Sequence, residues 1–77
     1  MTKLPSLTGK DILSILRKVG FEIKRQKGSH VFLQHPDGRA TVVPIHSGET
    51  IGPGLMAKIL RDVNMTKEEF YQLLKEK

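Results

Sequence analysis

Apolar residues near the start of the chain recur at the spacing of one helical face, at Ile12, Leu13, Leu16 and Val19. Thr8 stands where a side-chain cap is expected, and Asp11 is placed to complete a capping box. Gly20 follows the last apolar position and is a typical helix stop. The pattern therefore predicts a helix that begins after Thr8 and ends at Gly20.

The pattern then changes to the two-residue period of strands. Phe21, Ile23 and Arg25 alternate with polar neighbours, which predicts a half-buried first strand. Further strands are predicted over residues 30–35 and 40–45. The Asp37-Gly38 pair between them favours a two-residue type I′ hairpin.

This hairpin predicts where the three histidines lie. With a two-residue loop, His30 faces Ile45 and His46 lies one residue beyond that pair. A single bulged residue would bring His30 and His46 directly opposite each other. In either case these two imidazoles share one end of the sheet, and His35 lies at the other end.

The second half of the chain returns to helical spacing, with one stripe formed by Leu55, Met56, Ile59, Leu60 and Val63. Asn64 can end this helix in a left-handed conformation. A last short helix is predicted after Thr66, with Glu69 in capping-box position. The predicted fold is α+β: an α-β-β-β-α order with an extra C-terminal helix, and two main helices on one face of an antiparallel sheet.

Length and charge narrow the class of protein. With 77 residues the chain is expected to form one domain, residues 1–77, with a small core. Thirteen basic against eight acidic residues give a net charge of +5, which favours a polyanion or an acidic protein as partner. Between Arg17 and Lys27 lie five basic residues, and only Glu22 opposes them.

Composition also bears on location. The chain has no cysteine, which excludes a disulfide scaffold and is consistent with a protein of a reducing compartment. The first residues lack the apolar run of a signal peptide, and no segment is long and apolar enough to span a bilayer. We expect a cytoplasmic protein with no membrane association.

The candidate chemistry centres on a glycine turn that leads a histidine into a strand. RNA carries its own nucleophile, the 2′-hydroxyl, so a protein that cleaves it needs mainly a proton carrier and positive charge near the phosphate. His30 is the candidate general acid or base, and His46 is a possible second one. The candidate substrate-binding residues are Lys24, Arg25, Lys27, Gly28 and Ser29.

The same residues allow other interpretations. A metal or other cofactor is not expected, because there is no cysteine and no acidic residue stands beside His30 or His46. Ser29 and His30 form a poor nucleophile and base pair, because adjacent strand residues point to opposite faces. On spacing alone, a structural His30 that bonds a neighbouring carbonyl stays open as an alternative.

Five segments, in order and spacing, resemble the HicA family of toxin ribonucleases (the YcfA/HicA group): Gly20-Phe21, Lys27–His30, His35–Arg39, Val43–Glu49 and Ile59–Asp62. The resemblance implies a double-stranded-RNA-binding-domain-like fold and metal-independent cleavage of mRNA that arrests translation and growth. It also implies a HicB-like antitoxin as protein partner. The family's catalytic histidine matches His30, and the histidine of its Pro-x-His segment matches His46.

The chain departs from the family pattern before its second main helix, where Gly54-Leu55-Met56 replaces the frequent Gly-Thr-Leu. Two alternatives to a ribonuclease follow from the same features. One is a non-catalytic RNA-binding module of the same fold. The other is an inactive member that only pairs with an acidic partner.

Overall fold

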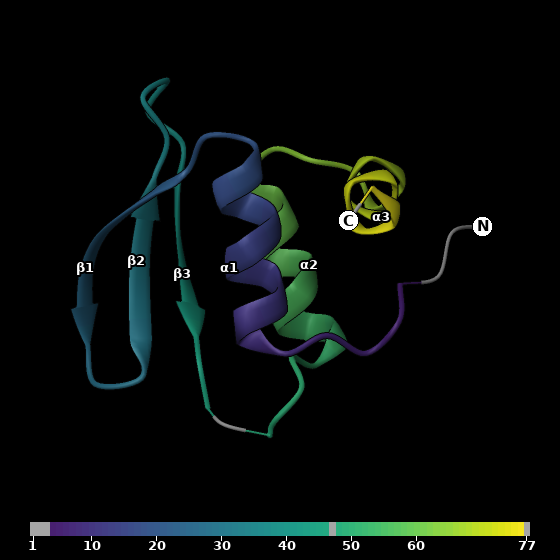
Figure 1. Ribbon diagram of the computed structural model, residues 1–77, viewed down its shortest axis with the longest axis horizontal. Coiled ribbons are helices and arrows are strands. Elements are labelled where there is room, and N and C mark those ends of the chain that lie inside the picture. Colours follow the sequence, from purple (N-terminus) through teal and green to yellow (C-terminus); the bar gives the residue numbers. More distant parts are fainter. Residues whose placement is uncertain (1–3, 47, 77) are drawn as a thin grey trace.

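The three strands form one antiparallel sheet in the order β1-β2-β3, and the helices lie to one side of it (Figure 1). The computed structural model describes residues 4–46 and 48–76. Its elements are α1 (Gly9–Lys18), β1 (Glu22–Lys27), β2 (His30–Gln34), β3 (Ala40–Pro44), α2 (Pro53–Asp62) and α3 (Lys67–Lys75). This confirms the predicted α+β fold, with the α-β-β-β-α layout of double-stranded-RNA-binding domains and one extra C-terminal helix.

The predicted starts of the first and last helices are confirmed by their capping contacts, whereas α1 ends at Lys18, two residues before the predicted stop at Gly20. The backbone N–H of Asp11 donates to Thr8 Oγ1 over 3.2 Å, and the Asp11 carboxylate accepts from the Thr8 N–H over 3.0 Å. The same reciprocal pair joins Thr66 and Glu69 at the start of α3. Asn64 follows α2 with a φ of 56°, the left-handed geometry that the sequence predicted.

The core lies between the helices and one face of β2 and β3. Along β2, Val31 and Leu33 are buried, and the residues between and beside them are more exposed. Val43 of β3 is buried on the same side as these two. These side chains pack with apolar residues of the three helices, chiefly Ile12, Leu16, Ile59, Leu60 and Phe70. The opposite face of the sheet, which we call the open face, is covered by none of the helices in the described part of the chain.

The β2–β3 hairpin differs from the predicted two-residue loop. The His35 N–H donates to Arg39 O over 2.8 Å, and the Gly38 N–H donates to His35 O over 2.9 Å. The loop therefore has three residues, Pro36, Asp37 and Gly38, and Gly38 takes a φ of 103°. Proline suits the first loop position, where φ is negative, and so the turn starts one residue earlier than predicted.

The longer loop shifts the pairing of β2 with β3 by one residue. Gln34 pairs with Ala40 and His30 with Pro44, so the predicted pair of His30 with Ile45 was wrong. Both strands also end one residue earlier than predicted, at Gln34 and Pro44.

The prediction of a half-buried first strand was also wrong. All six residues of β1 are exposed, and only Phe21, just before the strand, is buried. Figure 1 shows the reason: β1 is the strand farthest from the helices. The pairing also shifts between Ile23 and Arg25, so that Lys24 is an extra residue in a bulge.

A buried hydroxyl ties α2 to the sheet. Thr41 of β3 is buried, and its Oγ1 donates to Asp62 Oδ2 over 2.9 Å. The Lys58 ammonium also donates to this oxygen, and these two hydrogen bonds, that of Lys58 first, hold the pKa of Asp62 below its ordinary value. Their contribution to stability is therefore present above the ordinary pKa of 3.8 and is lost as the pH falls through the lowered value.

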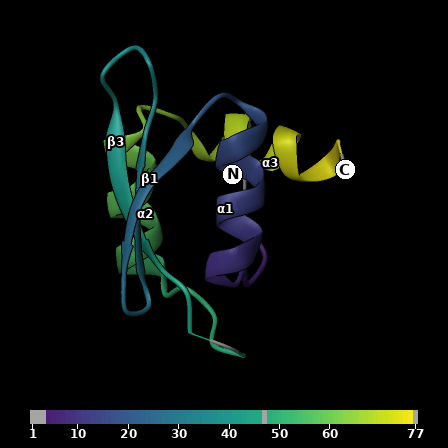
Figure 2. The same cartoon turned by 60° about the vertical axis from the view of Figure 1, so that its left-hand side comes forward.

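The start of α1 lies directly against the end of β3. Gly9 is buried, and a Cβ atom built on it would overlap the Pro44 carbonyl oxygen. Figures 1 and 2 both show the start of α1, the β1–β2 turn and the end of β3 at the same end of the molecule. Since Pro44 pairs with His30, this contact also fixes the position of α1 relative to His30.

We expect Gly9→Ala to destabilise the fold by about 1–3 kcal/mol, because the new methyl group forces α1 away from β3. The free energy of unfolding, measured in urea, tests this. Gly54→Ala is the matched control: Gly54 is also helical, and a Cβ there meets no atom within 4 Å. The control should be neutral or slightly stabilising. Equal losses in the two variants would contradict the close approach.

Candidate functional site

A tight turn at Gly28 and Ser29 joins β1 to β2 and places Lys27 opposite His30. Gly28 has a φ of 59°, and a Cβ atom there would meet nothing within 4 Å. The turn therefore requires glycine for its backbone conformation and not for space. The Gln26 side-chain amide donates to Gly28 O over 3.1 Å and holds the turn from the strand side.

His30 lies on the open face of the sheet. It is exposed, and it is followed in β2 by the buried Val31, which points to the core. Its cross-strand partners on the same face are Lys27 of β1 and Pro44 of β3. Its imidazole is therefore accessible from solvent at the end of the sheet, as the sequence predicted, and it does not belong to the core.

The bulge in β1 brings a second cation to this face. Without the bulge, Lys24 would pair with Phe32; in the structure Arg25 pairs with Phe32 instead. Because cross-strand partners share a face, Arg25 and Lys27 both lie on the open face with His30. Two of the three predicted phosphate-binding cations are thus gathered beside the histidine.

Lys24 is placed differently from the other two cations. Its ammonium donates to Glu22 Oε1 over 3.0 Å, and both side chains are exposed. This ion pair offsets the Lys24 charge locally, although an exposed pair adds little to stability. Lys24 is consequently the weakest of the predicted phosphate contacts.

His46 contacts Ser29 across the sheet end. Its Nε2 lies 3.2 Å from Ser29 Oγ, and the Ile45 N–H donates to Ser29 O over 2.7 Å. His30 and His46 are therefore not directly opposite each other, because the shifted hairpin pairing places Pro44 opposite His30. The expectation that both histidines share one end of the sheet is confirmed.

His35, the third histidine, has a structural environment. Its Nε2 lies 3.1 Å from Val19 O, so the ring links the hairpin to the end of α1, and its Nδ1 accepts from the Asp37 N–H over 3.1 Å. The ring also meets Phe21 edge-on, with 5.1 Å between centroids. Both ring nitrogens are engaged within the protein, and His35 lies at the far end of the sheet from His30.

Arg39 completes this structural cluster, a role that no local pattern in the sequence predicts. Its guanidinium lies 5.1 Å from the centroid of the Phe21 ring. It also donates to Asp37 over 2.8 Å and to Val63 O, at the end of α2, over 2.6 Å. Hydrogen bonds from Arg39, that of its backbone N–H first, lower the pKa of Asp37. Arg39 is thus a structural cation and not part of the positive charge near His30.

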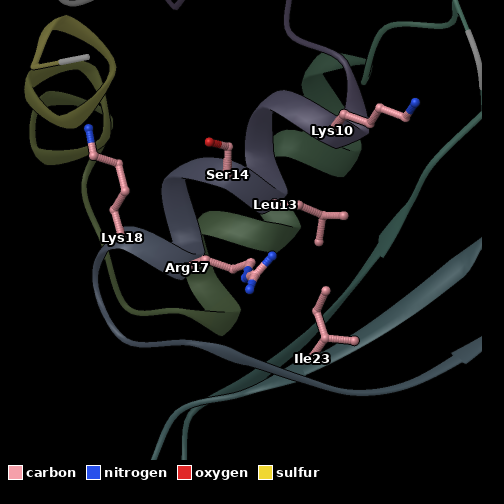
Figure 3. Close-up of a pocket in the computed structure, with 6 residues that line it drawn as sticks. All are labelled: Lys10, Leu13, Ser14, Arg17, Lys18 and Ile23. Carbon is pink, nitrogen blue, oxygen red and sulfur yellow. The ribbon is translucent and has the colours of Figure 1, made fainter.

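A second basic surface lies away from His30, in a groove between α1 and β1 (Figure 3). Leu13 and Ile23 point into the gap, and Ile23 is 43% exposed. The groove is lined by Lys10, Leu13, Ser14, Arg17, Lys18 and Ile23. The basic run between Arg17 and Lys27 is thus divided, since its first two cations line this groove and its last two lie on the open face.

Within residues 4–46 and 48–76, no three histidine, aspartate or glutamate side chains come together as metal ligands would. No helix in that part of the chain has the length and apolar character needed to cross a bilayer.

The chain is thus a small basic protein with the layout of a double-stranded-RNA-binding domain and with an exposed histidine at a glycine turn. A family model described as the HicA toxin of bacterial toxin-antitoxin systems matches residues 9–65, from the start of α1 to just before α3. The chain belongs to this HicA toxin family. No curated protein matches the chain. Family membership establishes a toxin of a toxin-antitoxin pair, and hence an antitoxin as partner.

Substitution of His35 should destabilise the fold more than substitution of His30. We expect His35→Ala to destabilise the fold by about 1–3 kcal/mol, because it leaves Val19 O and the Asp37 N–H without their partner and removes the ring contact with Phe21. His30→Ala should cost less than about 1 kcal/mol, as for other exposed residues. Urea denaturation of both variants measures the difference. A larger loss for His30→Ala than for His35→Ala would return His30 to a structural role.

Proposed function

We propose that this toxin is an endoribonuclease that cleaves mRNA without a metal ion and thereby blocks translation and growth. His30 acts as its general acid or base. Arg25, Lys27 and the turn at Gly28 and Ser29 hold the RNA backbone, with a smaller contribution from Lys24. The family supplies the toxin role, and the arrangement of these side chains supports the chemistry.

One observation carries the proposal: an exposed imidazole shares an open sheet face with two cations, and no acidic side chain within residues 4–46 and 48–76 forms an ion pair with either. Within the three strands, all in the described part of the chain, Glu22 is the single acidic residue, and it pairs with Lys24. A phosphate at His30 would therefore meet positive charge from Arg25 and Lys27. Such charge, fixed in place beforehand, stabilises the extra negative charge of the transition state.

The reaction requires few catalytic groups from the protein. The 2′-oxygen of one ribose attacks the adjacent phosphorus and loses its proton to a base, so a bond forms between these two atoms. The bond from phosphorus to the 5′-oxygen of the next nucleotide breaks, and that oxygen takes a proton from an acid. The products are a 2′,3′-cyclic phosphate and a free 5′-hydroxyl. One imidazole that performs either proton transfer contributes roughly 10²–10⁴ in rate.

His46 is the candidate for the other proton transfer or for holding the substrate. It is exposed and lies at the same sheet end, and its hydrogen bond with Ser29 Oγ restricts the ring orientation. Ser29 in turn follows Gly28 in the turn that precedes His30. This chain of contacts connects the two histidines through the turn without a direct contact between them.

The proposed partner is a HicB-like antitoxin that covers the face around His30. The net charge of +5 would attract an acidic protein as well as RNA. An antitoxin seated on the open face would inhibit simply by excluding the substrate from His30. The proposed location is the cytoplasm, where mRNA is translated.

His30→Ala should abolish growth arrest and lower RNA cleavage by about 10²-fold or more, while the melting temperature changes little. RNA affinity should persist, because phosphate contacts supply most of it. Purified protein is incubated with a long mRNA in the presence of a chelator, and cleavage, binding and melting are measured on the same preparation. His35→Gln serves as the histidine control, with wild-type cleavage expected for the fraction that is folded.

Cleavage by His30→Ala at the wild-type rate would overturn the catalytic assignment. Loss of wild-type cleavage in chelator would overturn metal independence. Binding of RNA without any cleavage by the wild-type protein would favour the non-catalytic RNA-binding module.

His46→Gln should lower the cleavage rate and flatten one limb of the pH-rate profile, because glutamine can hydrogen-bond but cannot transfer a proton in this range. Ser29→Ala keeps the imidazole and removes only its hydroxyl partner. It should therefore lower the rate less and leave both limbs in place. Cleavage rates across pH on the two variants test this, and a wild-type profile for His46→Gln would exclude His46 from the reaction.

A further inference from the structure

One phenylalanine lies outside the core, on the same open face as His30. The chain has three phenylalanines. Phe21 and Phe70 are 2% and 0% exposed, whereas Phe32 is only partly buried. Phe32 lies between Val31 and Leu33, whose side chains point to the core, so its own ring points away from the helices.

The neighbours of Phe32 leave its ring accessible to a ligand. Arg25 pairs with it from β1 and Val42 from β3, and none of the three described helices covers this face. Val42 is 39% exposed, so the apolar surface extends beyond the ring itself. The result is an aromatic surface with a guanidinium on one side and an aliphatic side chain on the other.

Phe32 stands two residues from His30 on the same face of β2. Two residues along a strand span roughly 7 Å. A nucleotide whose phosphate meets His30 could therefore bring an attached or adjacent base over the Phe32 ring. The row of Lys27, His30 and Pro44 and the row of Arg25, Phe32 and Val42 lie side by side on this face.

We propose that Phe32 stacks with an unpaired base next to the phosphate at which His30 transfers a proton, so that this toxin selects single-stranded RNA. This inference rests on the proposed function and adds the form of the substrate and the residue that recognises it. An aromatic ring can stack only on a base whose face is free, and in a duplex the neighbouring base pairs occupy those faces. Recognition at Phe32 therefore differs from the shape-based grip on duplex RNA that is typical of this fold.

Charge favours RNA over a protein as the occupant of Phe32. The side chains that surround the ring on this face include Arg25, Lys27 and His30, and the nearest acidic side chain in the strands, Glu22, is engaged by Lys24. A nucleotide offers both parts that this surface matches, an aromatic base for the ring and a phosphate for the cations.

The test compares Phe32→Leu, which stays apolar but cannot stack, with Phe32→Tyr, which can. Both are made in the His30→Ala background to prevent cleavage, and binding is measured to one RNA oligonucleotide as a single strand and as a duplex. Base stacking contributes about 1–3 kcal/mol, so Phe32→Leu should weaken single-strand binding about 5- to 150-fold. Phe32→Tyr should bind nearly as the parent does, and duplex binding should be the same in all three proteins.

Arg25→Ala is the matched control, since Arg25 is the direct neighbour of Phe32 but acts by charge. It should reduce the dependence of log affinity on log salt by about 0.7 for a single strand. Phe32→Leu should leave that slope unchanged. The parent protein also gives a readout that needs no variant at Phe32, because 2-aminopurine placed along the oligonucleotide should change its fluorescence at the stacked position.

Equal single-strand affinity for Phe32→Leu and its parent, together with no fluorescence change, would overturn the inference. If His30→Ala still abolished cleavage in that case, the proposed function would stand alone. If the wild-type protein bound single strands through Phe32 but cut no RNA, the stacking would stand and the proposed function would fail. If Phe32→Leu kept its RNA affinity but no longer bound a co-expressed antitoxin, Phe32 would serve protein docking and not RNA binding, and the inference would be wrong.

Discussion

The burial of Val31 and Leu33 beneath the helices is the constraint on which this structure depends. These residues are 1% and 0% exposed, and they belong to the central strand of a sheet that is covered on one face only. Since side chains alternate along a strand, their burial directs His30 and Phe32 to the open face. The same packing that stabilises a small protein thus presents the candidate reactive group to solvent.

The edge strand shows how the protein keeps many charges near its core without burying them. β1 contributes backbone pairing to β2, but every one of its side chains is exposed. The extra residue at Lys24 exchanges the faces of the residues that follow, so that Arg25 and Lys27 lie on the open face. The bulge is therefore the structural feature of the edge strand that determines which cations lie beside the candidate site.

The candidate site is completed by segments that are distant in sequence. The start of α1, the β1–β2 turn and the end of β3 converge at one end of the molecule (Figure 1). The contact of Gly9 with Pro44 joins the first of these to the last, and the hydrogen bond of Ser29 with His46 joins the second to the segment that follows β3. The proposed cleavage of RNA needs few protein residues, because RNA brings its own nucleophile.

The sequence alone determined the order of the elements, the capped helix starts at Thr8 and Thr66, and the exposed histidine at the Gly28 turn. These features depend on residues within a few positions of each other, so local pattern is sufficient. The register was established only by the pairing of the strands themselves, in which Gln34 meets Ala40 across a three-residue loop and Pro44 comes to lie opposite His30.

Pairing and packing likewise decided the two features that local pattern could not supply. The alternation before the Gly28 turn predicts Arg25 on the half-buried face, and only the bulge turns it outward. In the apolar run of β2, only the packing of the helices determines that Phe32, and not its neighbours, is left on the open face. The face of a strand residue depends on what covers the sheet, and that information lies in the helices, far away in the sequence.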